Sequence, residues 1–173
     1  MAELEELESL GGDRFAIDGS LVVTGSGILH MVSLLHLVEI TGTLAIDRAP
    51  QLTNLDGLFG LRTVGKSLEV KGNTGLRSLT GLNRVRTVGE NLVVFRNPQL
   101  ESLDALRRLR AVGESIDFRE NIILSDSAIV AFQDTMKARE FVGVFSIKRM
   151  DHRKVQNCSI ENCSLLINYT LKI

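Results

Sequence analysis

Apolar residues follow two different spacings in this chain, and the two alternate along it. Between Leu92 and Phe95 the spacing is two, so that Leu92 and Val94 share one side of an extended segment and Val93 and Phe95 share the other. Further on, leucine stands at every third position, as Leu100, Leu103, Leu106 and Leu109. A spacing of three is too short for an α-helical stripe and too long for one strand. The first pattern predicts a β-strand, and the second predicts short extended or 3₁₀-like segments around a coil.

The unit that carries both patterns, Val88 to Ala111, has copies on both sides. The copy before it begins at Val64 and the copy after it at Val112, and both offsets are 24 residues. Ile40 opens another copy 24 residues before Val64, and Ile17 opens one 23 residues before Ile40. Units of this length are too small to bury their own apolar side chains, so they stack on their neighbours. We therefore predict an all-β fold, a parallel β-solenoid of leucine-rich-repeat type with 24-residue coils.

Equivalent strand positions in the copies should face the interior of this solenoid. They form two rows, Leu21, Leu44, Leu68, Leu92 and Ile116, and Val23, Ile46, Val70, Val94 and Phe118. Stacking places these strands side by side in a parallel sheet with a spacing of about 4.8 Å. The core is then aliphatic, since the chain has no Trp and one Tyr.

Each unit also has two corners of characteristic composition. At one corner Asn73, Asn97 and Asn121 are equivalent, and asparagine there can adopt the left-handed conformation, bond the turn backbone and bridge one coil to the next. At the other corner stands a glycine, as Gly19, Gly42, Gly65, Gly89 and Gly113. We interpret both sets as structural.

The leucine pattern stops after Leu124, and a helical one follows. Ile129, Phe132 and Met136 share one face of a helix that would begin behind Ser125 or Asp126 as N-cap. Alternation then resumes from 141 to 148 and predicts one last strand. Such a helix would cap the end of the solenoid, where apolar side chains and a strand edge are otherwise exposed. We expect four parts: an N-terminal cap or partial repeat over 1–16, a solenoid of five repeats over 17–124, a capping helix and last strand over 125–150, and a tail over 151–173.

The combination of strand, Asn-Pro turn and leucine comb resembles the receptor L domain. The residues that carry this resemblance are GTLAIDRAPQLTNLDGLFGLRTVG and NLVVFRNPQLESLDALRRLRAVG, and it extends over about residues 17–124. The L domain is the leucine-rich β-solenoid of the insulin and epidermal growth factor receptor ectodomains and of many surface proteins of microbes and algae. The resemblance implies a right-handed solenoid that serves as a binding scaffold. Unlike the receptors, this chain has no cysteines flanking the repeats, and its repeats are more regular.

Charge and composition narrow the range of partners. The chain carries 20 Lys and Arg against 21 Asp and Glu, and so balanced a charge does not favour nucleic acid or an acidic membrane as partner. No apolar run approaches the roughly 20 residues of a membrane span. The three histidines, His30, His36 and His152, lack metal-ligand spacing, and no phosphate-binding glycine motif occurs. We expect neither an enzyme nor a metal or cofactor site.

The outward strand positions form the candidate partner-binding face. Two columns of it contain Glu69, Lys71, Val93, Phe95, Asp117 and Arg119. An aromatic side chain surrounded by charges is a plausible anchor for a protein partner. Alternatively, the apolar pair, Val93 and Phe95, is β-favouring surface or lies under the tail.

A basic stripe is a second candidate site. It consists of Arg62, Arg86 and Arg110, spaced by 24 residues and flanked by Arg84, Arg107 and Arg108. Stacked arginines concentrate positive potential and could bind an anion or an acidic partner. Alternatively, the stripe is a solvated surface whose arginines pair with Glu90 and Glu114.

The tail differs in composition from the rest of the chain. Asn157, Asn162 and Asn168 each open an N-x-S/T sequon, and Cys158 and Cys163 are the two cysteines of the chain. In an oxidising compartment the asparagines would accept glycans and the cysteines could form a disulfide. The sequons could equally have arisen by chance.

Two functions follow from these patterns. The first is a non-catalytic protein-recognition module, extracellular or at the cell surface, favoured by the L-domain resemblance and the sequons. The second is a rigid structural or scaffold subunit of a larger cytoplasmic or organellar complex. The acidic first residues favour the second, because they do not look like a signal peptide.

Overall fold

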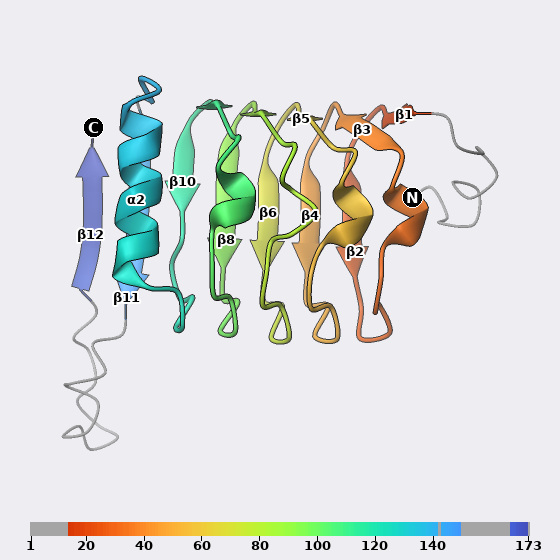
Figure 1. The fold of residues 1–173 in the computed structure, drawn as a ribbon, viewed down its shortest axis with the longest axis horizontal. Coiled ribbons are helices and arrows are strands. Elements are labelled where there is room, and N and C mark those ends of the chain that lie inside the picture. The colour runs from red at the N-terminus through yellow and green to blue at the C-terminus, as the bar shows by residue number, and fades with distance from the viewer. Residues whose placement is uncertain (1–13, 142, 150–166, 173) are drawn as a thin grey trace, which may run out of the picture.

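The computed structural model describes residues 14–141, 143–149 and 167–172 and has the form of a parallel β-solenoid (Figure 1). Strands stack in two sheets, which form two walls of each coil. The five-stranded sheet contains, in spatial order, β1 (Phe15–Ile17), β3 (Leu37–Ile40), β5 (Thr63–Val64), β7 (Thr87–Val88) and β9 (Ala111–Val112). The seven-stranded sheet contains β2 (Leu21–Thr24), β4 (Leu44–Asp47), β6 (Leu68–Lys71), β8 (Asn91–Phe95), β10 (Ser115–Asp117), β11 (Val144–Arg149) and β12 (Ile167–Lys172). The predicted fold class is confirmed, with about four turns between β1 and β9.

Neighbouring coils are in register at the predicted period. Leu44 pairs with Leu68 and Leu68 with Leu92, so the strand positions repeat every 24 residues through β4, β6 and β8. The five-stranded sheet was not predicted. Its strands β5, β7 and β9 are only two residues long, and two residues are too few to show alternation.

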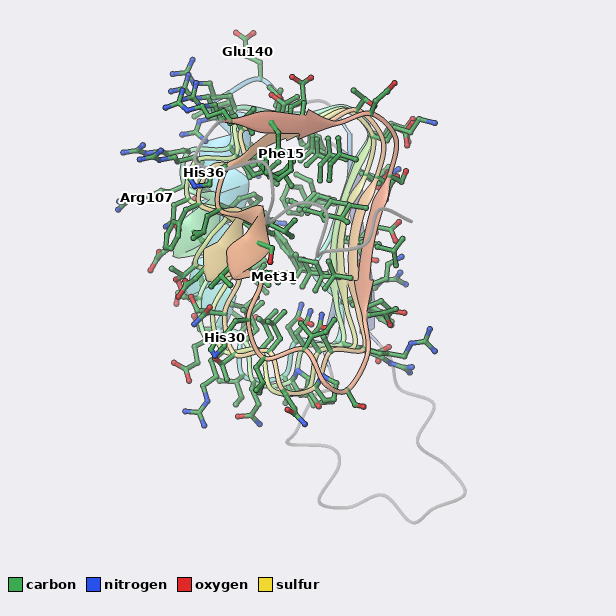
Figure 2. All side chains as sticks on the ribbon, turned by 90° about the vertical axis from the view of Figure 1, so that its right-hand side faces the viewer. Phe15, His30, Met31, His36, Arg107 and Glu140 are labelled. Carbon is green, nitrogen blue, oxygen red and sulfur yellow. The ribbon has the colours of Figure 1, made fainter. Side chains whose placement is uncertain are left out.

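The interior of the solenoid is filled by the predicted apolar rows. Leu44, Leu68 and Leu92 are fully buried, and the comb leucines of the second half of each unit are also buried. The view along the solenoid shows these side chains packed between the walls, while His36 and Arg107 point outward on the same side (Figure 2). Three of the four combs contain a 3₁₀ turn, η1 (Val32–Leu34), η2 (Asp56–Leu58) and η3 (Asp104–Leu106). The comb from Leu76 to Val85 has hydrogen-bonded turns without a 3₁₀ helix.

A buried asparagine ladder, Asn73, Asn97 and Asn121, ties the coils together at one corner. The Oδ1 of Asn73 accepts a hydrogen bond from the Ala49 amide at 2.9 Å, and the Oδ1 of Asn97 accepts one from the Asn73 amide at 3.1 Å. In turn, the Oδ1 of Asn121 accepts one from the Asn97 amide at 3.0 Å. The predicted bridging role is confirmed, because each asparagine satisfies a backbone donor of the preceding coil.

The left-handed conformation, however, does not belong to these asparagines. It belongs to the residue before each of them and to the equivalent residue one coil earlier, Arg48 (φ 51°), Gly72 (φ 66°), Arg96 (φ 57°) and Glu120 (φ 59°). That part of the turn prediction is wrong. The left-handed residue turns the chain so that the next side chain, asparagine, points into the corner of the coil.

The helix α2 (Asp126–Lys137) replaces the leucine comb in the last coil. Its N-cap is Ser125, whose Oγ accepts a hydrogen bond from the Ala128 amide at 3.2 Å. Phe132 of this helix lies edge-on to Phe118, with ring centroids 5.1 Å apart, and Phe145 of β11 packs beside both rings. Aromatic rings therefore fill the space that leucines fill elsewhere, and the predicted capping helix and last strand are both present.

The sheet continues past β11 with a strand from the predicted tail. β12 runs antiparallel to β11, whereas every other strand pair in the two sheets is parallel. In the part of the chain that the structure describes, no helix is long and apolar enough to cross a membrane.

Candidate functional site

The outer face of the seven-stranded sheet brings most of the predicted binding residues together. We define the outer face as the outward side chains of β4, β6, β8 and β10, which stand side by side in Figure 1, together with Arg96, Arg119 and Glu120 directly after β8 and β10. Strand register places Lys71 beside Phe95, and it places Val93 between Glu69 and Asp117. These neighbours are held about 4.8 Å apart by the backbone hydrogen bonds of the sheet. Five of the six predicted residues keep accessible surface: Glu69, Lys71, Val93 and Phe95 are half-buried, and Arg119 is exposed.

Phe95 lies at the end of β8, between two guanidinium groups. The Cζ of Arg96 is 5.2 Å from the ring centroid, and that of Arg119 is 5.6 Å from it. Both distances are typical of cation–π contacts, which hold an arginine against the ring. Arg96 was not among the predicted binding residues. The prediction took every second residue of the strand as outward, and Arg96 directly follows Phe95. Its left-handed backbone brings it back over the ring.

The charged side chains of the outer face are paired with one another. Lys71 Nζ lies 2.6 Å from Glu69 Oε2, and Arg96 Nε lies 2.7 Å from Glu120 Oε2. Ion pairs on a surface add little to stability. Their effect here is to fix where the charges stand around Phe95.

Asp117 was predicted to lie on the exposed surface, and this prediction is wrong. It is only 8% exposed, because β11 adds a strand beyond β10 and because Arg119 covers the carboxylate. The guanidinium of Arg119 donates to both carboxylate oxygens, with Nη2 2.6 Å from Oδ2. This hydrogen bond is the main reason why the pKa of Arg119 is raised above its ordinary value, against the lowering effect of burial. Asp117 therefore positions Arg119 and does not itself present a charge to a partner.

The basic stripe lies directly before the strands β5, β7 and β9 of the five-stranded sheet, on a different side of the coil from the outer face. Arg62, Arg86 and Arg110 are exposed and stack on successive coils: the Arg86 amide donates to the Arg62 carbonyl at 2.8 Å, and the Arg110 amide donates to the Arg86 carbonyl at 2.7 Å. The expected pairs with Glu90 and Glu114 do not form.

The two glutamates have other partners. Glu90 Oε2 accepts from Ser67 Oγ at 3.3 Å, and Glu114 Oε2 accepts from Asn91 Nδ2 at 3.0 Å. Each of the two glutamates directly follows the corner glycine of its coil. The chain changes direction at this corner, so the glutamates lie on a different side of the coil from the stripe. Among the described residues, none of the ion pairs involves an arginine of the stripe.

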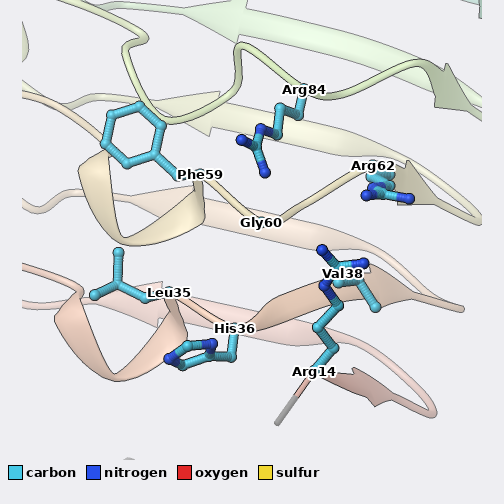
Figure 3. A pocket seen from close by; sticks show the side chains of 8 residues that line it. All are labelled: Arg14, Leu35, His36, Val38, Phe59, Gly60, Arg62 and Arg84. Carbon is cyan, nitrogen blue, oxygen red and sulfur yellow. The ribbon is translucent and has the colours of Figure 1, made fainter. Parts of the chain in front are cut away.

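A hollow of about 270 Å³ opens within this basic surface, and we call it the arginine hollow. It is lined by Arg62, Arg84, Arg86 and Arg108. Beside it lies a second hollow of about 270 Å³, which shares two of these arginines and adds an apolar wall (Figure 3). This apolar hollow is lined by Arg14, Leu35, His36, Val38, Phe59, Gly60, Arg62 and Arg84.

At the level of sequence, Arg84 and Arg108 were named only as residues that flank the stripe. They are themselves 24 residues apart and form a second column beside it. Arg14 belongs with them because Phe15 pairs with Leu37, which makes Arg14 the neighbour of His36. The irregular length of the first repeat hides that relation.

The remaining predicted site residues lie in the tail. Asn157, Asn162, Cys158 and Cys163 fall outside the described residues. Asn168 lies in β12, opposite Lys148 of β11. Within the described part of the chain, no group of three or more His, Cys, Asp or Glu residues could hold a metal ion.

The fold thus defines a parallel β-solenoid with a leucine-lined interior, an outer face that carries Phe95, and a row of arginines before the strands of the five-stranded sheet. A scan against protein-family models finds no family that matches the sequence, and a search of curated proteins finds no relative.

Proposed function

We propose that this chain is a non-catalytic protein-recognition module that binds a protein partner through the outer face. The observation that carries the proposal is Phe95, an aromatic ring that stays accessible on a rigid sheet between Arg96 and Arg119. Aromatic and arginine side chains are the residues most enriched in the energetic centres of protein interfaces. Because both arginines are already held in place, binding would cost little side-chain entropy.

The chemistry of the partner follows from that of the face. An apolar side chain of the partner would pack on the Phe95 ring, and the remaining donor positions of Arg96 and Arg119 would meet carbonyl or carboxylate oxygens. Lys71 and Glu69 neutralise each other and would form part of the rim.

The test uses two phenylalanines that differ in position. Phe95→Ser removes the proposed anchor, and Phe59→Ser is the matched control, because Phe59 is 39% exposed and lies on the wall away from the outer face. Proteins that the wild-type chain captures from the native source are identified and purified. Their affinities for the wild-type chain, Phe95→Ser and Phe59→Ser are then measured. We expect Phe95→Ser to weaken binding by about 30-fold, equivalent to about 2 kcal/mol at an interface centre.

Two results would contradict the proposal. One is equal affinity of the wild-type chain and Phe95→Ser for a purified partner, with both variants folded by circular dichroism. The other is a loss of partner binding with Phe59→Ser alone.

We further propose that the module is L-domain-like and works outside the cell or at its surface. The resemblance of the repeats and the three sequons support this location. A mass shift on glycosidase treatment of natively expressed protein, lost when Asn168 is replaced by Gln together with the other two sequon asparagines, is the expected result. A native protein of unmodified mass would favour the cytoplasmic or organellar alternative.

The second candidate function, a scaffold subunit within a larger complex, is favoured by apolar side chains of the first coil. Val22, Leu29 and Val32 are each more than half exposed. Apolar residues grouped at one end of a solenoid favour stacking on another subunit. Light scattering of the purified chain tests this idea: a monomer at all concentrations, unchanged by Val32→Ser, would argue against it.

A further inference from the structure

The arginine hollow has no part in the proposed protein-recognition face and is built for a different ligand. Its four arginines come from three successive coils, and each stands next to a buried apolar residue that fixes its direction. Arg84 and Arg86 flank Val85, which is fully buried, so both side chains leave the same side of the wall. Arg108 stands in the same relation to buried Leu109 one coil later. The convergence of the guanidinium groups is therefore a consequence of the repeat.

The far wall of the hollow is held from outside by Arg139, which follows α2. Its Nη2 donates to the Arg107 carbonyl at 3.0 Å, and its Nη1 donates to the Leu109 carbonyl. These bonds hold the backbone on both sides of Arg108. Arg139 thus acts as a positioning residue for the hollow, and a preorganised site loses less entropy when it binds.

The charge of the hollow is not balanced by the protein. The residues that line it are all arginine, and no carboxylate is among them. Four like charges within one hollow repel each other, and the stacked coils hold the backbone positions that carry them at a fixed spacing. A small anion whose several charges are spread along it can meet several guanidinium groups at once, and it relieves this repulsion better than an anion with a single charge. A carboxylate or a phosphodiester carries one charge and a single phosphate group up to two, whereas linked phosphates carry several.

We propose that the arginine hollow binds linked phosphate groups, such as those of inorganic polyphosphate or of the phosphate chain of an organic oligophosphate. Guanidinium groups suit such a ligand, since each can donate two parallel hydrogen bonds to phosphate oxygens. Arg62 and Arg86 contact it from one column, and Arg84 and Arg108 contact it from the other.

The apolar hollow next to it distinguishes the two sources of linked phosphates. It shares Arg62 and Arg84 with the arginine hollow, and Phe59 and Leu35 form its apolar wall (Figure 3). Gly60 leaves space here, because it occupies the position that Arg84 and Arg108 occupy in later coils. In this coil a side chain would collide with the backbone, since a Cβ on Gly60 would lie 2.6 Å from the Leu37 carbonyl oxygen. An organic group attached to the phosphates can therefore lie against Phe59.

Isothermal titration calorimetry on the full chain tests the proposal, since a protein with no Trp and one Tyr gives little fluorescence signal. The probes are sodium tripolyphosphate, orthophosphate, ATP and heparin, all at one fixed ionic strength. We expect tripolyphosphate to bind at least about 10-fold more tightly than orthophosphate, with an affinity that falls as salt is raised. If ATP binds more tightly than tripolyphosphate and Phe59→Ser removes this difference, the ligand of the hollow is an organic oligophosphate. If the two probes bind with equal affinity, the ligand is inorganic polyphosphate.

Variants separate the hollow from general surface charge. Arg84→Gln and Arg86→Gln should each weaken tripolyphosphate binding by about 10-fold, equivalent to about 1.4 kcal/mol. Arg77→Gln is the matched control, because it removes the same charge at an exposed position outside the hollow. Phe95→Ser should leave tripolyphosphate binding unchanged, so the two proposed sites fail or succeed separately.

Three outcomes would overturn the proposal. The first is tripolyphosphate that binds no more tightly than orthophosphate. The second is equal weakening by Arg77→Gln and Arg84→Gln, which would indicate an effect of net charge alone. The third is tight binding of heparin with none of tripolyphosphate, which would make the surface a site for a long sulfated chain.

Discussion

Replacing Asn97 with alanine removes the central link of the asparagine ladder, and we expect it to be among the most costly single changes in the solenoid. The Asn97 side chain is fully buried and bonds in both directions. Its Oδ1 accepts from the backbone amide and from the side-chain amide of Asn73, at 3.1 and 3.2 Å. Its Nδ2 donates to the Val70 carbonyl at 2.9 Å and to the Phe95 carbonyl at 3.2 Å.

The magnitude follows from the groups that alanine leaves without these partners. The buried amide of Asn73 loses the acceptor supplied by Asn97, and the Val70 carbonyl loses a side-chain donor. A buried polar group left without a partner costs about 1–3 kcal/mol. Two such groups predict a loss of about 2–6 kcal/mol in the free energy of unfolding.

The assay is urea unfolding followed by circular dichroism, with Asn83→Ala as matched control. Asn83 makes one comparable bond, in which its Oδ1 accepts from the Gly81 amide at 3.0 Å, so its loss should cost about 1 kcal/mol. The slope of unfolding free energy against urea should stay unchanged if only stability is affected. A double variant, Asn73→Ala with Asn97→Ala, should cost less than the sum of the two, because the residues share bonds. Asn97→Ala within about 0.5 kcal/mol of Asn83→Ala would refute the account.

Three further predictions concern the corners and the C-terminal end. Gly89→Ala should destabilise the chain by about 2–3 kcal/mol, because its Cβ would lie 1.9 Å from the Gly65 carbonyl oxygen and force neighbouring coils apart. At Gly72 a Cβ has space, but the backbone is left-handed with a φ of 66°, so Gly72→Ala should cost only about 1–2 kcal/mol. A lower urea midpoint for Gly72→Ala than for Gly89→Ala would contradict both explanations. Phe132→Ala should cost about 3–5 kcal/mol and speed hydrogen exchange in α2, since its ring packs on Phe118; unchanged protection there would contradict the capping role.

The repeat and the core could be predicted from the sequence because both depend on local spacing. The offset of 24 residues fixed which strands stack, and the leucine comb identified the interior side chains. The N-cap Ser125 and the helical face of Phe132 and Met136 were equally readable. Each of these features is written within one unit or between adjacent units.

Features that depend on how a coil bends could not be predicted in the same way. The left-handed residues include Arg96 and Glu120, which have no sequence preference for that conformation, and the corner imposes it on them. Asp117 could be placed in its column but not recognised as covered, because β11 comes from outside the repeats. The basic stripe was recognised, but its proposed pairing with Glu90 ignored the corner between them.

Because the coils stack in a fixed register, the solenoid can be lengthened by whole repeat units. Duplication of one complete unit, for example 64–87, would move everything after it along the axis by about 4.8 Å and leave each column on its own side. Such a duplication would add one more arginine to each of the two basic columns, at positions equivalent to Arg86 and Arg84. An insertion of a single residue in a strand would instead turn the next apolar positions outward. Descendants of this chain can therefore differ in length by complete turns and still retain the same surfaces.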